Sequence, residues 1–160
     1  MSTRVRPGGR GRTTAAEVRR FDPGRFRWRG VPARPYKMPG GTHWRGVERF
    51  VLLGAGAPTA FHLRYFEIAP GGFSSFERHR HAHAVLVVRG RGRVRLGATE
   101  RRVGPMDFVY IPPGVPHQFR AGREPFGFLC PVDAARDRPR PLTAGGLRRG
   151  PSLARPARGR

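Results

Sequence analysis

The residues best suited to chemistry are one carboxylate and three histidines, placed in two short stretches of the chain. Glu77, His79 and His83 stand close together, and His117 follows a Pro-Pro-Gly sequence at 112–114. Imidazole nitrogens with one carboxylate oxygen suit a divalent first-row transition metal, and such a set leaves coordination positions for water or substrate. The residue types therefore predict a metal site that could support a reaction.

These four residues need strands to bring them together. Glu77 and His79 are two positions apart, so they point to the same side of a strand, and His83 opens the next apolar run. His81 has the same parity, but we expect it in the turn between the two strands, exposed and away from the metal. His117 must arrive from a strand distant in sequence. We predict that all four predicted ligands face the interior of a small barrel.

Length and composition favour an all-β domain. A chain of 160 residues suits one domain with a real core, and its 23 glycines and 17 prolines separate many short apolar runs. No long helical period is present, so two packed antiparallel sheets or a jelly-roll barrel would bury the apolar faces. Strands are predicted near 31–37, 47–53, 60–68, 75–80, 83–89, 92–96, 107–111, 116–120 and 126–132. Turns are predicted at 54–58, 69–72, 89–92 and 112–114.

The positive charge is concentrated at the two ends of the chain. The formal net charge is +22, and Lys37 is the single lysine beside many arginines. Because the arginine-rich ends contain few apolar residues, we expect disordered basic tails over 1–27 and 136–160, flanking a barrel domain over 28–135. The tails lack interleaved aromatic residues and any known reading module, so no specific nucleic-acid partner is expected.

The sequence also bears on the compartment. Cys130 is the single cysteine, which excludes an intrachain disulfide and suggests a reducing environment. No apolar stretch approaches the roughly 20 residues needed to span a bilayer, and the basic N-terminal stretch has no apolar core of a secretory signal. We therefore expect a cytoplasmic protein with no membrane partner.

Several other residues have two readings each. Phe126, Phe128 and Cys130 alternate onto one face, and Cys130 is a small buried apolar residue in preference to a reactive thiol. Arg64 and Glu67 point to opposite faces of one strand, so at most one looks inward. Arg64 could anchor an anionic substrate, although a surface ion pair is the simpler reading. Three further aromatic residues are expected in the core or in a subunit contact: Trp28, Trp44 and Tyr36.

The histidine region resembles the first sequence motif of the cupin superfamily. That motif is Gly, five residues, His-x-His, three or four residues, Glu, six residues and Gly. Aligned on Gly71, it places Glu77 at the first His, His79 at the second, His83 at the Glu and Gly90 at the closing Gly. The ligand types are permuted, but with His117 the total remains three histidines and one carboxylate.

The second cupin motif is matched in part. It is Gly, five residues, Pro-x-Gly, two residues, His, three residues and Asn, and it is satisfied here at Pro112, Gly114 and His117. Met106 stands in place of the opening Gly, and Ala121 in place of the final Asn. Over most of residues 28–140 the chain looks like small single-domain bacterial and archaeal cupins.

The resemblance implies an antiparallel jelly-roll β-barrel with one divalent metal ion (Fe, Mn, Ni, Zn or Cu) held by Glu77, His79, His83 and His117. It also implies action on a small oxygen-bearing molecule, as a dioxygenase or an isomerase. The alternative is a non-catalytic cupin that binds or senses a small ligand, because fold does not determine function. The expected partners are a small molecule and a second copy of the chain in a homodimer.

Overall fold

The structure is a computed structural model that describes residues 15–37, 43–135 and 140–141, and in these residues it contains strands and no helix. The strands are β1 (Phe21–Asp22), β2 (Arg27–Trp28), β3 (Arg34–Pro35), β4 (Arg45–Leu53), β5 (Phe61–Phe73), β6 (Glu77–Arg78), β7 (His83–Arg89), β8 (Gly92–Leu96), β9 (Thr99–Val103), β10 (Phe108–Ile111), β11 (His117–Ala121), β12 (Phe126–Asp133) and β13 (Arg140–Pro141). No helix in this described part is long and apolar enough to cross a membrane.

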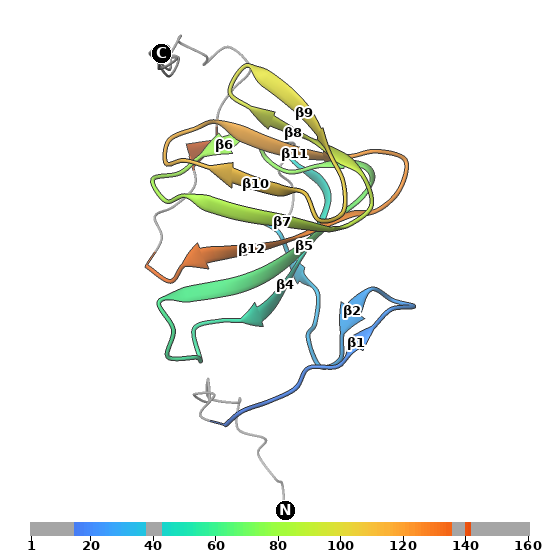
Figure 1. Ribbon diagram of the computed structural model, residues 1–160, viewed down its shortest axis with the longest axis vertical. Helices are drawn as coiled ribbons and strands as arrows, with labels where there is room; N and C mark the ends of the chain where they lie inside the picture. Colours follow the sequence, from blue (N-terminus) through green and yellow to red (C-terminus); the bar gives the residue numbers. More distant parts are fainter. Residues whose placement is uncertain (1–14, 38–42, 136–139, 142–160) are drawn as a thin grey trace, which may run out of the picture.

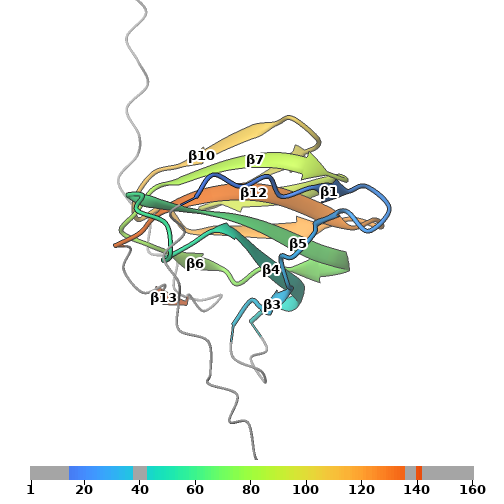
Figure 2. The same cartoon turned by 90° about the horizontal axis from the view of Figure 1, so that it is seen from below.

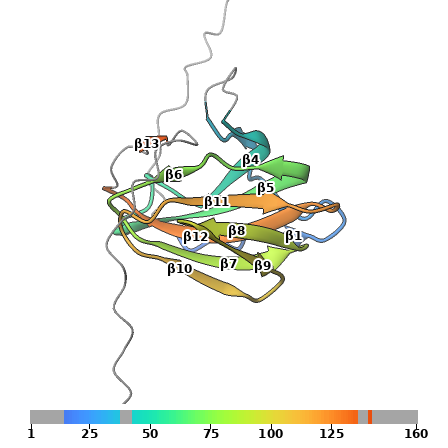
Figure 3. The ribbon, with the colours of Figure 1, turned by 90° about the horizontal axis from the view of Figure 1, so that it is seen from above.

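All strand pairs are antiparallel, and one sheet of 11 strands curls around the core (Figure 1). Its main path runs β10, β7, β12, β5, β11, β6 and β13. Strand β4 extends the sheet from β5, and β8 extends it from β11. Seen from above, β8 and β11 lie over β7 and β12, so the curled sheet covers two sides of the interior (Figure 3). The predicted all-β fold, built from an antiparallel sheet that curls toward a barrel, is confirmed.

Strand β5 is longer than predicted and serves both sides of the fold. The expected turn at 69–72 lies inside β5, which pairs with β12 over its first part and reaches β11 at Phe73. Gly71 takes a positive φ of 66°, and a Cβ on Gly72 would stand 2.5 Å from the Arg45 carbonyl oxygen. The Gly-Gly pair therefore bends the strand instead of ending it, because only glycine fits both the dihedral angle and the space.

The interior is filled by alternate residues of the long strands. Val85 and Val87 of β7, Phe66 and Ile68 of β5 and Phe128 of β12 belong to one buried apolar cluster. The period of two that defines a strand sends their neighbours outward. Trp44 packs against this cluster as predicted.

A second apolar cluster lies on the outer face, and it corrects the predicted N-terminal tail. Residues 15–27 were expected to be disordered, but β1 and β2 form a hairpin that lies across the sheet (Figure 2). Phe26 and Trp28 pack against Phe50 and Tyr65 of the sheet. Burial of these aromatic rings outweighs the basic composition, because each can remove a large apolar area from water. Residues 1–14 lie outside the described residues.

Two other strands were missed. Strand β9 pairs with β8 and is mostly exposed, with charged side chains that conceal its period. Strand β13 pairs with β6, so residues 140–141 of the predicted C-terminal tail join the sheet. The rest of the predicted tail, 136–139 and 142–160, lies outside the described residues.

Candidate functional site

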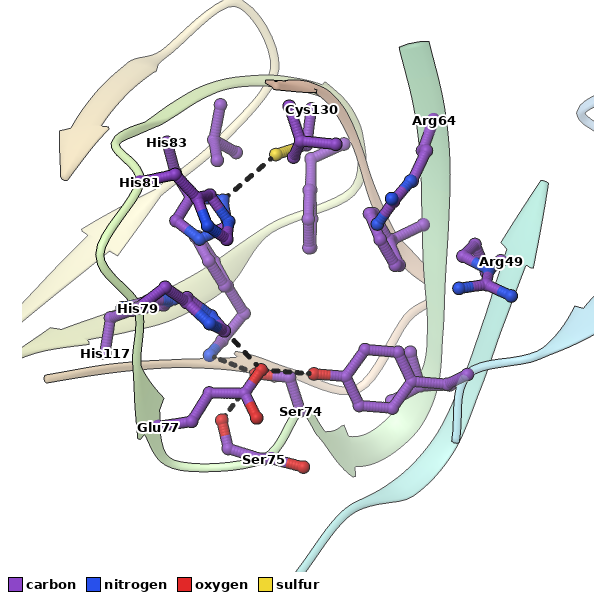
Figure 4. A pocket seen from close by; sticks show the side chains of 17 residues that line it. Arg49, Arg64, Ser74, Ser75, Glu77, His79, His81, His83, His117 and Cys130 are labelled. Carbon is purple, nitrogen blue, oxygen red and sulfur yellow. Dashed lines mark hydrogen bonds and ion pairs between the residues drawn. The ribbon is translucent and has the colours of Figure 1, made fainter. Parts of the chain in front are cut away.

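A cavity of about 120 Å³ opens inside the curled sheet. Its lining comes from strands β4, β5, β6, β7, β11 and β12 and from the connections between them. Figure 4 shows the histidines on one side and two arginines, Arg49 and Arg64, on the other. Apolar side chains, among them Phe66, Phe119 and Phe128, complete the wall. This mixture of apolar lining and a few convergent polar groups is typical of small-molecule sites.

Three of the four predicted ligands converge in this cavity. His79, His83 and His117 each offer one ligand nitrogen, and these nitrogens all lie within 4.8 Å of one another. His83 begins β7 and His117 begins β11, while His79 directly follows β6. The Pro-Pro-Gly turn that precedes His117 is joined to the backbone of His79, since the amide of Gly114 donates to the carbonyl oxygen of His79 at 2.6 Å. The described residues therefore contain a group that could hold a metal ion.

The hydrogen bonds of the three rings fit a metal. The Nδ1 of His117 lies 2.9 Å from the Val115 carbonyl oxygen, which can only accept, so Nδ1 carries the proton and Nε2 is left as a ligand. The Nδ1 of His83 contacts the Cys130 sulfur at 3.3 Å, and the Nε2 of His79 lies 3.4 Å from Glu77. The other nitrogens, His83 Nε2 and His79 Nδ1, are buried with no hydrogen-bond partner. His79 and His83 therefore each have one partnered and one bare nitrogen, which is the usual pattern of metal-binding histidines.

The protonation states agree with this reading. Burial, reinforced by the neighbouring histidines, lowers the pKa of His83 to about 3. Burial is also the main cause that lowers the pKa of His117 to about 4. Both rings are neutral at pH 7, and the neutral ring is the form that binds a metal.

Glu77 is buried at the edge of this group, and its carboxylate is already well partnered. It forms an ion pair with Lys37 and accepts a hydrogen bond of 3.2 Å from the Tyr36 hydroxyl. Burial alone would raise the pKa of Glu77, but hydrogen bonds and charge from His79 and Lys37 outweigh it and hold the pKa below its usual value. The ionised carboxylate therefore orients His79, and its place as a fourth metal ligand stays a prediction.

The prediction for His81 is wrong. Its backbone lies in the connection between β6 and β7, as expected, but the side chain lines the cavity. Its ring lies 4.7 Å from the His79 ring and 4.8 Å from the His83 ring, measured between centroids. The short connection preserves the alternation of the two strands, so every second side chain from 77 to 83 faces the cavity.

Sequence reasoning missed Tyr36 and Lys37 as members of the site. Both come from the segment after β3, far from the histidines in sequence, and Tyr36 lines the cavity as well as packing on Trp44. No sequence feature marked Tyr36 as a residue of the site. Lys37 stands out as the single lysine of the chain, but that count alone does not place it beside Glu77.

Cys130 and Arg64 have the positions that the strand parity allowed. Cys130 is buried and lines the cavity beside Phe128, and burial raises the pKa of its thiol to about 12, so it is protonated at neutral pH. Arg64 faces inward and lines the same cavity. Glu67 faces outward and pairs with Arg89. The simpler reading of Arg64 as a surface residue is therefore wrong.

Comparison with known proteins agrees with the fold. The sequence profile of the cupin domain matches residues 64–132. The chain is 45% identical over 115 residues to the 1-methylthio-D-xylulose 5-phosphate methylsulfurylase of Rhodospirillum rubrum, a match that covers 71% of this chain and 73% of that protein.

Solved structures give the same answer. A cupin-2 domain protein from Rhodospirillum rubrum matches with a TM-score of 0.70 and 43% identity, over 76% of this chain and 81% of that one. A cupin 2 conserved barrel domain protein from Rhodopseudomonas palustris matches with a TM-score of 0.73 and 44% identity, over 81% of this chain and 89% of that one. With its curled antiparallel sheet and its inward-facing histidines, the chain belongs to the cupin superfamily.

Proposed function

We propose that this protein is a metal-dependent cupin enzyme whose substrate is a small phosphorylated sugar bearing a methylthio group. The observation that carries the proposal is the cluster of His79, His83 and His117 at the cavity, in which two buried nitrogens, His79 Nδ1 and His83 Nε2, have no hydrogen-bond partner. The substrate class is supported by the 45% identity to a protein named for a methylthio-xylulose phosphate.

The three histidines would hold the metal, with Glu77 as the predicted fourth ligand, and the ion would be Fe, Mn, Ni, Zn or Cu. When bound, a divalent metal supplies Lewis-acid polarisation of the carbonyl or hydroxyl oxygens of a sugar. A keto sugar has such oxygens on adjacent carbons.

The protein's own side chains supply orientation and a dry environment. Glu77, held by Lys37 and Tyr36, fixes the ring of His79. The thiol of Cys130 holds a proton beside His83. The phenyl rings make part of the wall apolar, and a lower local dielectric there would strengthen polar contacts to the substrate.

Turnover of 1-methylthio-D-xylulose 5-phosphate tests the proposal. The full-length protein, loaded in turn with each of the five metals, is incubated with this compound with and without a thiol, and substrate loss is followed by mass spectrometry. We expect metal-dependent loss that the double variant His83→Ala/His117→Ala abolishes. Binding without turnover under all conditions would instead support the non-catalytic ligand-binding alternative.

The same experiment distinguishes the two reactions expected from the sequence. A dioxygenase would consume dissolved oxygen in step with substrate loss, which an oxygen electrode measures. An isomerase would give a product of unchanged mass. The reaction that we propose is loss of the methylthio group without oxygen uptake: the added thiol R'SH takes the methylthio group as the mixed disulfide R'S–SCH3, and carbon 1 keeps the electron pair of the broken C–S bond and takes up the proton.

Two expectations about the protein in the cell complete this proposal. A homodimer is expected, and sedimentation equilibrium of the full chain tests it. A reducing cytoplasmic location is supported by the single cysteine, and localisation of a tagged chain tests it.

A further inference from the structure

We infer that Arg64 and Arg49 form an anion subsite that binds the phosphate of the substrate, across the cavity from the histidines. This inference rests on the proposed function for the identity of the ligand, and on the arrangement of the cavity for the place where its phosphate binds.

The strand register places both arginines on the inner face. Arg49 of β4 is paired with Phe66 of β5, and Arg64 of β5 is paired with Val51 of β4. The two arginines are therefore diagonal neighbours on the same face, a separation that two long side chains can bridge. Both line the cavity, and in Figure 4 they lie across it from His79 and His117.

The charges of the cavity favour an anion on this side. Among the described residues that line it, Glu77 is the sole carboxylate, and Lys37 is its ion-pair partner. The two guanidinium groups add two positive charges on the opposite wall. A phosphate monoester is close to a dianion at neutral pH and accepts paired hydrogen bonds from the planar guanidinium fork.

The burial of Arg64 makes the site different from a surface patch. Arg64 is 8% exposed, whereas most of the arginines for which the structure gives a burial are exposed to water. Its apolar surroundings include Phe66 and Val132, and a low local dielectric strengthens attraction to an anion. Nonspecific phosphate binding to the exposed arginines is much more strongly screened by salt.

The position also matches the shape of the proposed ligand. Along the wall, His83 contacts the sulfur of Cys130, and Cys130 is the cross-strand partner of Arg64. A five-carbon sugar with its methylthio group on carbon 1 and its phosphate on carbon 5 carries the two groups at opposite ends. With the phosphate at the arginines, carbons 1 and 2 face the histidines.

The test compares three probes on the full-length protein by isothermal titration calorimetry near 0.15 M salt: inorganic phosphate, D-xylulose 5-phosphate and unphosphorylated D-xylulose. We expect the monoester to bind more tightly than the other two. In Arg64→Met and Arg49→Met its affinity should fall roughly 10-fold or more, the size expected for one lost charge-assisted contact. Arg93→Gln is the matched control, since it removes an exposed arginine of β8, and should leave the affinity unchanged.

A second variant covers the case in which Arg64→Met does not fold. Arg64→Lys keeps the charge and the stem but loses the planar fork, and its affinity should lie between those of the wild type and Arg49→Met. Metal affinity should stay within about 2-fold of wild type in every arginine variant.

The outcomes separate this inference from the proposed function. Unchanged monoester affinity in both Arg64→Lys and Arg49→Met would overturn the subsite, and so would equal affinity for inorganic phosphate and the monoester. Arginine-dependent binding of the monoester without turnover of the methylthio sugar would leave the subsite standing and overturn the proposed reaction.

Discussion

The two faces of strand β5 use similar residues for opposite purposes. On the outer face, Glu67 accepts a hydrogen bond of 2.8 Å from the Tyr65 hydroxyl and one of 2.6 Å from Arg89. On the inner face, Arg64 and Phe66 look into a cavity where His83 has a buried nitrogen with no hydrogen-bond partner.

This difference separates structural polar groups from those that serve a ligand. Buried polar atoms in proteins are nearly always satisfied, as Glu67 and Tyr65 satisfy each other. Two unsatisfied nitrogens in one cluster are costly to the fold alone, and a bound group would remove that cost. The contrast predicts that inner-face variants change binding while outer-face variants change stability.

The largest expected effect is on the inner face. His83→Ala or His117→Ala should weaken metal binding at least roughly 100-fold, because each removes a ligand from a small set. Metal content after dialysis and titration with Zn²⁺ or Mn²⁺ provide the measurement. His43→Ala, at an exposed position, is the control and should bind metal normally. Full metal content in both cavity variants would mean that the cluster is not the metal site.

The next effect is on the outer face. Phe50 is fully buried against Tyr65, and Phe50→Ala should lower the free energy of unfolding by about 3–5 kcal/mol. Urea unfolding gives the free energy, and metal titration of the folded variant should give a wild-type affinity. A large loss of metal affinity in a folded Phe50→Ala protein would break the division between the two faces.

Acid should destabilise the metal-free protein through the inner face. The folded-state pKa is about 3 for His83 and about 4 for His117, against about 6.5 in an unfolded chain. Between pH 6.5 and 4 the unfolded state therefore binds more protons, and stability should fall as the pH falls, on the order of 1–2 kcal/mol per pH unit. Urea unfolding at several pH values measures this slope. In His83→Ala the free energy of unfolding should depend less steeply on pH. An unchanged pH dependence would show that the protonation of these rings is not its cause.

The smallest effect belongs to the outer hydrogen bond. Tyr65→Phe removes the hydroxyl that donates to Glu67 but leaves the Arg89 contact, so stability should fall by about 1 kcal/mol. Thermal unfolding is sensitive enough to detect the change. The affinities for ligand and metal should be unchanged. A change in either affinity would show that the outer face of β5 is energetically coupled to the cavity.

The fold was predictable because the middle of the chain alternates strongly. Strands β7 and β8 have the predicted bounds, and β4, β10, β11 and β12 differ by one or two residues at their ends. The bend in β5 was not predictable, because Pro70-Gly71-Gly72 has the composition of a turn and only its contacts show that pairing continues.

The site was predictable as far as local parity reaches. Alternation along one strand groups His79 with Glu77, and the Pro-Pro-Gly turn indicated His117. The same alternation applies to His81. The prediction of an exposed His81 was wrong because it assumed that the alternation stops in the short connection between β6 and β7. Tyr36 and Lys37 lie about 40 residues from Glu77 in the sequence. Strand alternation relates only near neighbours, so it could not predict these contacts.

The bend of β5 also helps to set the distance between the two sides of the cavity. One continuous strand carries Arg64 near its start and, past the Gly71-Gly72 bend, pairs at Phe73 with the strand that begins at His117. In the proposed function, the two ends of the bound sugar would therefore lie at two places along one strand. A change in the angle of that bend would change the distance between these two places, and with it the length of the ligand that fits between them.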